Sequence, residues 1–72
     1  MQIFGKDIKL KSIKIGEMLD IEKEDLSETD MAIRICSLAT GISEEDIRNT
    51  DIKYIKDVSK VVDFITGKAK GK

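Results

Sequence analysis

Hydrophobic residues in the middle of the chain recur at helical spacing. From residue 31 onward they fall at intervals of three or four, at Met31, Ile35, Leu38 and Ile42. Ser27 and Gly41 flank this segment and are of the types that begin and end helices. The pattern therefore predicts a helix over 28–40 with one apolar face. Ile33 falls on the opposite side, where it is either covered by the N-terminal segment or free to contact another protein.

Two further helices are expected in the second half of the chain. "SEEDI" opens with Ser43 as an N-cap and three acids in the first turn, which predicts a short helix over 43–49. Thr50 or Asp51 then caps a helix over 51–66, which Gly67 ends. Its core-facing stripe is formed by Tyr54, Ile55, Val58, Val61, Val62 and Ile65.

The N-terminal part has a different pattern. "DIKLKSIKI", residues 7–15, alternates apolar and polar positions on either side of Ser12, which predicts an extended segment or a short hairpin. Ile15, Met18 and Leu19 then follow helical spacing and predict about two helical turns. We therefore expect a mainly α fold, a small helical bundle with a short N-terminal β-hairpin or extended segment. It forms one domain over 1–66, and "GKAKGK", 67–72, is expected to be a disordered basic tail.

Size and composition limit the classes of protein. The chain has 72 residues, of which 40% are hydrophobic and 38% charged, as in a folded domain with a thin core. No segment approaches the ~20 apolar residues of a membrane span, and the N-terminus lacks an apolar signal core. We expect a cytosolic protein without a membrane partner.

The residue types indicate binding rather than catalysis. Cys36 is the only cysteine, its position in an apolar pattern favours core packing, and histidine is absent. Glu44, Glu45 and Asp46 lie where helix starts collect acids. We therefore expect no enzyme, no catalytic or metal-binding residues, no cofactor and no small-molecule ligand.

Charge is distributed unevenly along the chain. Residues 1–16 carry +3, residues 17–51 carry eleven acids against three basic residues for −8, and residues 52–72 carry +4. Such a pattern either folds the chain back on itself or joins one copy to the next, so a homo-oligomer stays open. With two arginines and three aromatic residues, nucleic-acid binding is not expected.

One family shares the order of these motifs. The elements are "AIRICSLATG", "SEEDI", the Asp51 of "TDIKYI" and "VVDFITG". From Met31 to Gly67 the chain resembles the C-terminal part of the tail assembly chaperones of tailed bacteriophages. These are small E-type proteins encoded just before the tape measure protein.

The resemblance implies a binding protein with the tape measure protein as its partner. Members of this family cover the long helical tape measure protein in the host cytoplasm, keep it soluble, and are absent from the mature virion. Residues expected to contribute to partner or self contacts are Ile8, Leu10, Ile33, Tyr54 and Phe64. Phe64 lies at the edge of its helical stripe and could equally belong to the core. The alternative is a small helical protein-interaction module or regulator of phage or bacterial origin.

Overall fold

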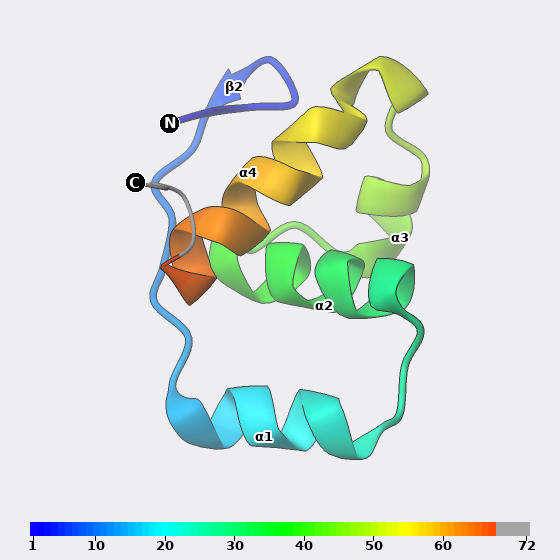
Figure 1. The fold of residues 1–72 in the computed structure, drawn as a ribbon. Coiled ribbons are helices and arrows are strands. Elements are labelled where there is room, and N and C mark those ends of the chain that lie inside the picture. The colour runs from blue at the N-terminus through cyan, green and yellow to red at the C-terminus, as the bar shows by residue number, and fades with distance from the viewer. Residues whose placement is uncertain (68–72) are drawn as a thin grey trace.

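The computed structural model describes residues 1–67 and is mainly helical, with a two-stranded antiparallel hairpin at its N-terminus (Figure 1). Its elements are β1 (Gln2–Ile3), β2 (Lys6–Asp7), α1 (Ile15–Lys23), α2 (Glu28–Thr40), α3 (Glu44–Arg48), the 3₁₀ helix η1 (Ile52–Tyr54) and α4 (Ile55–Thr66). The predicted fold class is confirmed. Residues 68–72, most of the predicted disordered tail, lie outside the described residues.

Helix α2 has the bounds that its end signals predict. Ser27 Oγ accepts a hydrogen bond from the backbone N–H of Asp30 at 3.2 Å and so caps the first turn. At the other end, Gly41 has a φ of 80° and donates its N–H to the Ser37 carbonyl at 2.9 Å. Glycine adopts this left-handed conformation without a Cβ penalty. The helix therefore ends at Thr40.

Helix α3 is a short capped turn between α2 and η1. Ser43 Oγ accepts from the backbone N–H of Asp46 at 3.1 Å. The acids of the first turn complement the helix dipole, as the sequence predicts. The helix is one residue shorter at each end than the expected 43–49.

The last predicted helix, 51–66, begins as a 3₁₀ turn and continues as α4. Asp51 is the cap, because its Oδ1 accepts from the backbone N–H of Lys53 at 2.9 Å. The Thr50 hydroxyl instead donates to a carbonyl of α3. Gly67, with a φ of 78°, ends α4 as predicted.

The hairpin lies earlier in the chain than the predicted segment 7–15. Its two-residue turn consists of Phe4 and Gly5, with φ angles of 53° and 78°. Two left-handed residues match the twist of a tight hairpin, but phenylalanine is rarely found there and gives no turn signal. Residues 8–14 have no regular secondary structure and run along the side of the molecule to α1 (Figure 1).

Three contacts fasten the N-terminal segment to the helices. The backbone N–H of Phe4 donates to Asp57 Oδ2 on α4 at 2.8 Å. The Phe4 ring meets Tyr54 edge to face, with 6.1 Å between the ring centroids. Farther along, the Lys11 N–H donates to the Ala39 carbonyl at the end of α2 at 2.8 Å. A hairpin that is weak alone is thus stabilised by packing on α4 and α2.

The main core lies between α2 and α4. Its buried residues are Ile3, Ile33, Cys36, Ala39, Ile47, Val58 and Val61. Ile33, for which the sequence left open a covered position or a free contact surface, is only 9% accessible and belongs to this core. Helix α2 contacts α1 as well as α3 and α4, so the buried part of its surface is wider than one stripe. Leu38 was predicted to be in the core but is exposed.

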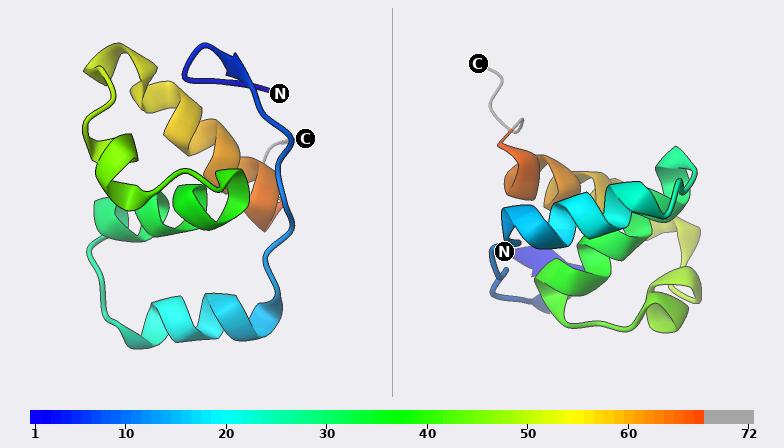
Figure 2. Two further views of the ribbon diagram at one scale, coloured as in Figure 1. Left: turned by 180° about the vertical axis from the view of Figure 1, so that it is seen from behind. Right: turned by 90° about the horizontal axis from the view of Figure 1, so that it is seen from below.

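Helix α1 runs beside α2 in the opposite chain direction, away from α4 (Figures 1 and 2). The predicted helix is confirmed. Of the three apolar residues that predicted it, Ile15 and Leu19 are exposed and Met18 is half-buried, while Ile21 is the one buried residue of the helix. Arg34 of α2 donates to Glu24, the residue that ends α1, at 2.6 Å. The helix is therefore held by one buried side chain and an ion pair at its end.

Candidate functional site

Two adjoining hollows form an apolar groove between α2 and α4. Their volumes are about 240 Å³ and about 370 Å³. Both are lined by Ile33 of α2 and by Ile55 and Val58 of α4, so one hollow continues into the other. Ile33 and Val58 are buried and form the floor, while Ile55 is half exposed. We refer to this feature as the α2–α4 groove.

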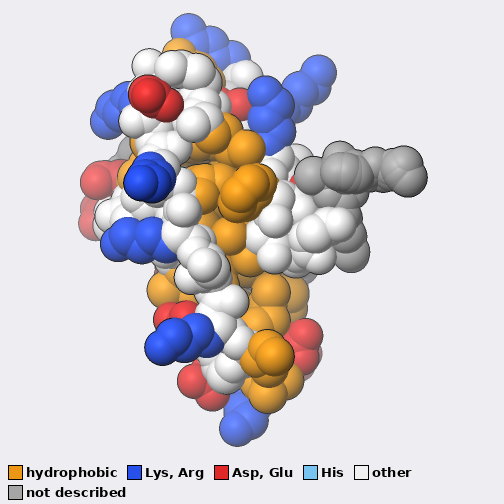
Figure 3. Space-filling view, turned by 90° about the vertical axis from the view of Figure 1, so that its left-hand side faces the viewer, with side chains coloured by type: hydrophobic (Ala, Val, Ile, Leu, Met, Phe, Trp, Pro, Cys, Tyr) orange, Lys and Arg blue, Asp and Glu red, His pale blue; other side chains and the backbone are white. Residues whose placement is uncertain are grey.

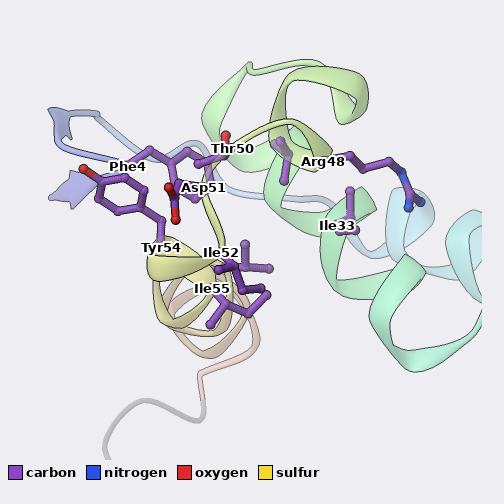
Figure 4. A pocket seen from close by; sticks show the side chains of 10 residues that line it. Phe4, Ile33, Arg48, Thr50, Asp51, Ile52, Tyr54 and Ile55 are labelled. Carbon is purple, nitrogen blue, oxygen red and sulfur yellow. The ribbon is translucent and has the colours of Figure 1, made fainter.

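The smaller hollow is bordered by four segments of the chain. Figure 4 shows Phe4 and Tyr54 at one end and Ile33 and Arg48 on the opposite side. Its further lining residues are Ile47, Thr50, Asp51, Ile52, Ile55 and Val58. Most of these side chains are apolar, so water in this hollow finds few hydrogen-bond partners and is readily displaced by an apolar group.

The larger hollow lies along α2 and the middle of α4. Besides the shared residues it is lined by Glu28, Thr29 and Ala32 of α2 and by Ser59, Val62 and Asp63 of α4. Ala32 and Ser59 have short side chains, which leave space between two helices that larger side chains would fill. The hollow therefore has an apolar floor and polar borders.

Ion pairs hold the wall of the groove that α3 forms. Arg48 donates to Asp30 of α2 at 2.8 Å, and Arg34 donates to Glu44 at the start of α3. The Arg48 guanidinium, and then the Ser27 hydroxyl, hold the pKa of Asp30 below its ordinary value. These contacts keep α3 against α2, and with it Ile47 in the core.

A second apolar surface lies on the side where the N-terminal segment runs. Figure 3 shows hydrophobic side chains in a continuous band over this side, from the hairpin end of the molecule to the α1 end, with lysines along one border. Apolar side chains that gather on one side, rather than lying singly, are typical of contact surfaces. It provides a second candidate contact face.

The five residues predicted for partner contacts do not form one site. Ile33 and Tyr54 come together as lining of the smaller hollow. Ile8 and Leu10 are half-buried and pack against the core, outside both hollows. Phe64 is 53% exposed and lines neither hollow. Only Phe64 has the free surface that the sequence interpretation expected of a contact residue.

Sequence reasoning missed Ile52 and misplaced Ile55. Both are exposed and line the smaller hollow, although Ile55 was predicted to be in the buried stripe. One signal could have revealed them. The apolar positions from residue 52 to 65 cover about two-thirds of a helix circumference, which is wider than the ~100° stripe that packs on one core.

Cys36 is a packing residue. It is fully buried, and burial, followed by the negative charge of Asp57, raises the pKa of its thiol to about 11. At neutral pH the thiol is therefore protonated and weakly nucleophilic.

Among residues 1–67, no group of three or more His, Cys, Asp and Glu could hold a metal ion, and no helix is long and apolar enough to cross a membrane.

Comparison with protein-family models, with curated proteins and with solved structures gave no match. The α2–α4 groove and the exposed apolar side chains are therefore the features from which a function can be argued.

Proposed function

We propose that the chain is a tail assembly chaperone of a tailed bacteriophage, which binds the tape measure protein during tail assembly and keeps it soluble. The observation that carries a binding role is the open α2–α4 groove, with buried Ile33 and Val58 in its floor and Ile55 at its rim. The identity of the client follows from the resemblance over Met31 to Gly67. The proposed place of action is the host cytoplasm, and the mature virion is expected to lack the chain.

The groove suits a helical client. An apolar floor between two helices accepts the apolar face of an amphipathic helix, whose side chains at spacings of three and four enter successive hollows. A tape measure protein has a long apolar stripe that aggregates unless it is covered. Covering it removes apolar surface from water at a gain of about 25 cal/mol per Å² before ordering costs. Many copies of a small domain can cover a long helix in this way.

The exposed apolar band offers a second contact (Figure 3). A protein that lines a long filament needs one surface for the filament and benefits from another for the next copy, since neighbouring copies then add their affinities. Phe64 is an exposed aromatic residue outside the groove, and its substitution tests whether apolar surface outside the groove takes part in contacts. Ile8 and Leu10, which are half-buried, contribute to either contact only through their exposed edges.

The test is co-expression with the long helical protein encoded next to this chain. We expect the tape measure protein to be insoluble alone and soluble with the chain, and the two to co-purify. Phe64→Ser should keep the interaction if Phe64 serves contacts between copies. Ile33→Asp, by contrast, would place a charge in the core and is unsuitable as a surface variant.

Neighbouring genes separate this function from that of a regulator or other interaction module. A tail tube gene upstream and a very long helical gene downstream are expected for a chaperone. If the neighbouring long protein is equally soluble without the chain, or if no such gene is present, the proposed function is wrong.

A further inference from the structure

Carboxylates dominate the border of the α2–α4 groove. The charged residues that line its two hollows are Glu28, Arg48, Asp51 and Asp63. The single cation, Arg48, is already paired with Asp30 at 2.8 Å. Among residues 1–67, neither Glu28 nor Asp63 takes part in an ion pair. Within this part of the chain, the open border therefore carries a carboxylate without an ion-pair partner on each side of the larger hollow.

Helices α2 and α3, which form one wall of the groove, add to the negative charge of its border. Residues 28–48, which contain α2 and α3, hold five acids against Arg34 and Arg48, for a net charge of −3. The lysines of η1 and α4 line neither hollow, and one of them, Lys53, lies over the Tyr54 ring at 5.3 Å from its centroid. A cleft with charge of one sign and apolar walls attracts ligands of the opposite charge, because the field concentrates in it.

We infer that the groove selects a basic amphipathic helix, in which lysine or arginine residues flank the apolar stripe. This deepens the proposed function and rests on it, since it takes the groove as the client site. The apolar stripe of the partner covers Ile33, Val58 and Ile55. Its flanking cations lie beside Glu28 on α2 and Asp63 on α4, where each ion pair forms next to a surface that the partner has cleared of water.

A second copy of this chain is the competing occupant. Its basic N-terminal segment, with lysines at positions 6, 9, 11 and 14, has the charge that the border attracts. That segment is already fastened to its own α2 and α4 through Lys11 and Phe4, and it has no helical stripe to offer. The contacts therefore favour a separate helical partner.

Two synthetic helical peptides test the charge preference. Both carry the same stripe of leucines at spacings of three and four, one flanked by lysines and the other by glutamates. Binding of each labelled peptide to the full-length protein is measured by fluorescence anisotropy at low and high salt. We expect the lysine peptide to bind about tenfold more tightly at low salt, with a smaller preference at high salt.

Protein variants locate the preference in the groove. Glu28→Gln combined with Asp63→Asn should reduce the ratio of the two affinities by about threefold or more. The control combines Asp20→Asn and Glu45→Gln, which remove the same net charge from exposed positions on α1 and α3 that line neither hollow. A ratio that falls equally in both double variants would show a general charge effect and overturn the inference.

The remaining outcomes separate the inference from the proposed function. If Ile55→Asp abolishes binding of both peptides but the wild type binds them equally, the groove binds helices without a charge preference, and only the inference is wrong. If sedimentation shows a dimer that the lysine peptide must dissociate, the occupant is a second copy and the inference is again wrong. If neither peptide binds and the tape measure protein stays insoluble, the proposed function is wrong as well.

Discussion

Helices α4 and α1 are both short and amphipathic, yet they are held in place very differently. Helix α4 buries Val58 and Val61 in the main core and receives the hairpin through Asp57. Helix α1 buries only Ile21, which lies outside the main core cluster. An amphipathic pattern therefore defines a helix, whereas the number of neighbouring elements decides how much of its apolar face is buried.

The largest expected effect is the loss of α4 from the core. Val58→Asp places a charge among buried apolar side chains without a partner, at a cost of about 4 kcal/mol or more. We expect the domain to unfold, because a chain of this size has only a few kcal/mol of stability. Thermal melting followed by circular dichroism measures this, with the exposed Ser59→Asp as control. If the Val58→Asp variant melts like the parent, the position of α4 in the core is wrong.

Truncation of the buried residue of α1 should have a smaller and more local effect. Ile21→Ala removes the one buried contact of α1, at a cost of about 2–4 kcal/mol to that helix. We expect amide protons of α1 to exchange faster while those of α4 keep their protection. Leu19→Ala, on the exposed side of the same helix, should leave both rates unchanged. Equal loss of protection in α4 would show that α1 and α4 unfold as one unit.

The next effect comes from the thiol of Cys36, on the side of α2 that faces α4. We expect it to change the free energy of unfolding by about 1 kcal/mol per pH unit. Its pKa is raised from an ordinary 9.0 to about 11, so between these pH values the folded chain keeps a proton that the unfolded chain has lost. Stability is therefore expected to fall as the pH rises from about 9 toward about 11. Urea unfolding of the parent and of Cys36→Ala at several pH values isolates this slope. An identical pH dependence in both proteins would contradict the assigned pKa.

The smallest expected effect comes from the ion pair that holds the end of α1. Arg34→Leu removes the hydrogen bonds to Glu24 and Glu44 and should lower the free energy of unfolding only slightly, because water screens these accessible charges. The loss is expected to shrink at high salt. Urea unfolding at two salt concentrations measures it. A loss of several kcal/mol that salt leaves unchanged would mean that packing, and not charge, holds this junction.

Local signals in the sequence predict the helices well, because caps act within one turn. Ser27 and Gly41 give the bounds of α2, and Gly67 gives the end of α4. The position of the hairpin could not be predicted, because its turn uses Phe4 in a left-handed conformation that few phenylalanines adopt, and contacts with Tyr54 and Asp57 far along the chain stabilise it.

The groove could be predicted only in part, since it depends on how α2 meets α4. Tyr54 was expected to contribute to contacts and does line the smaller hollow. Ile33 was expected either to be covered or to contact a partner, and it lies in the floor. Ile55 was expected in the core and lies at the rim. Periodicity places these side chains on a helix face, but which face is covered follows from the crossing of two helices distant in the chain.

Paired variants of α4 and α1 test most directly whether the α2–α4 groove binds the client. Ile55 and Leu19 are 50% and 51% exposed, so Ile55→Asp and Leu19→Asp place the same charge at equally accessible helical positions inside and outside the groove. The affinity of each folded variant for the tape measure protein is measured in pull-down titrations. We predict a loss of about tenfold or more for Ile55→Asp and parent-like binding for Leu19→Asp. Equal binding by the two variants, or a loss confined to Leu19→Asp, would contradict a client site in the groove.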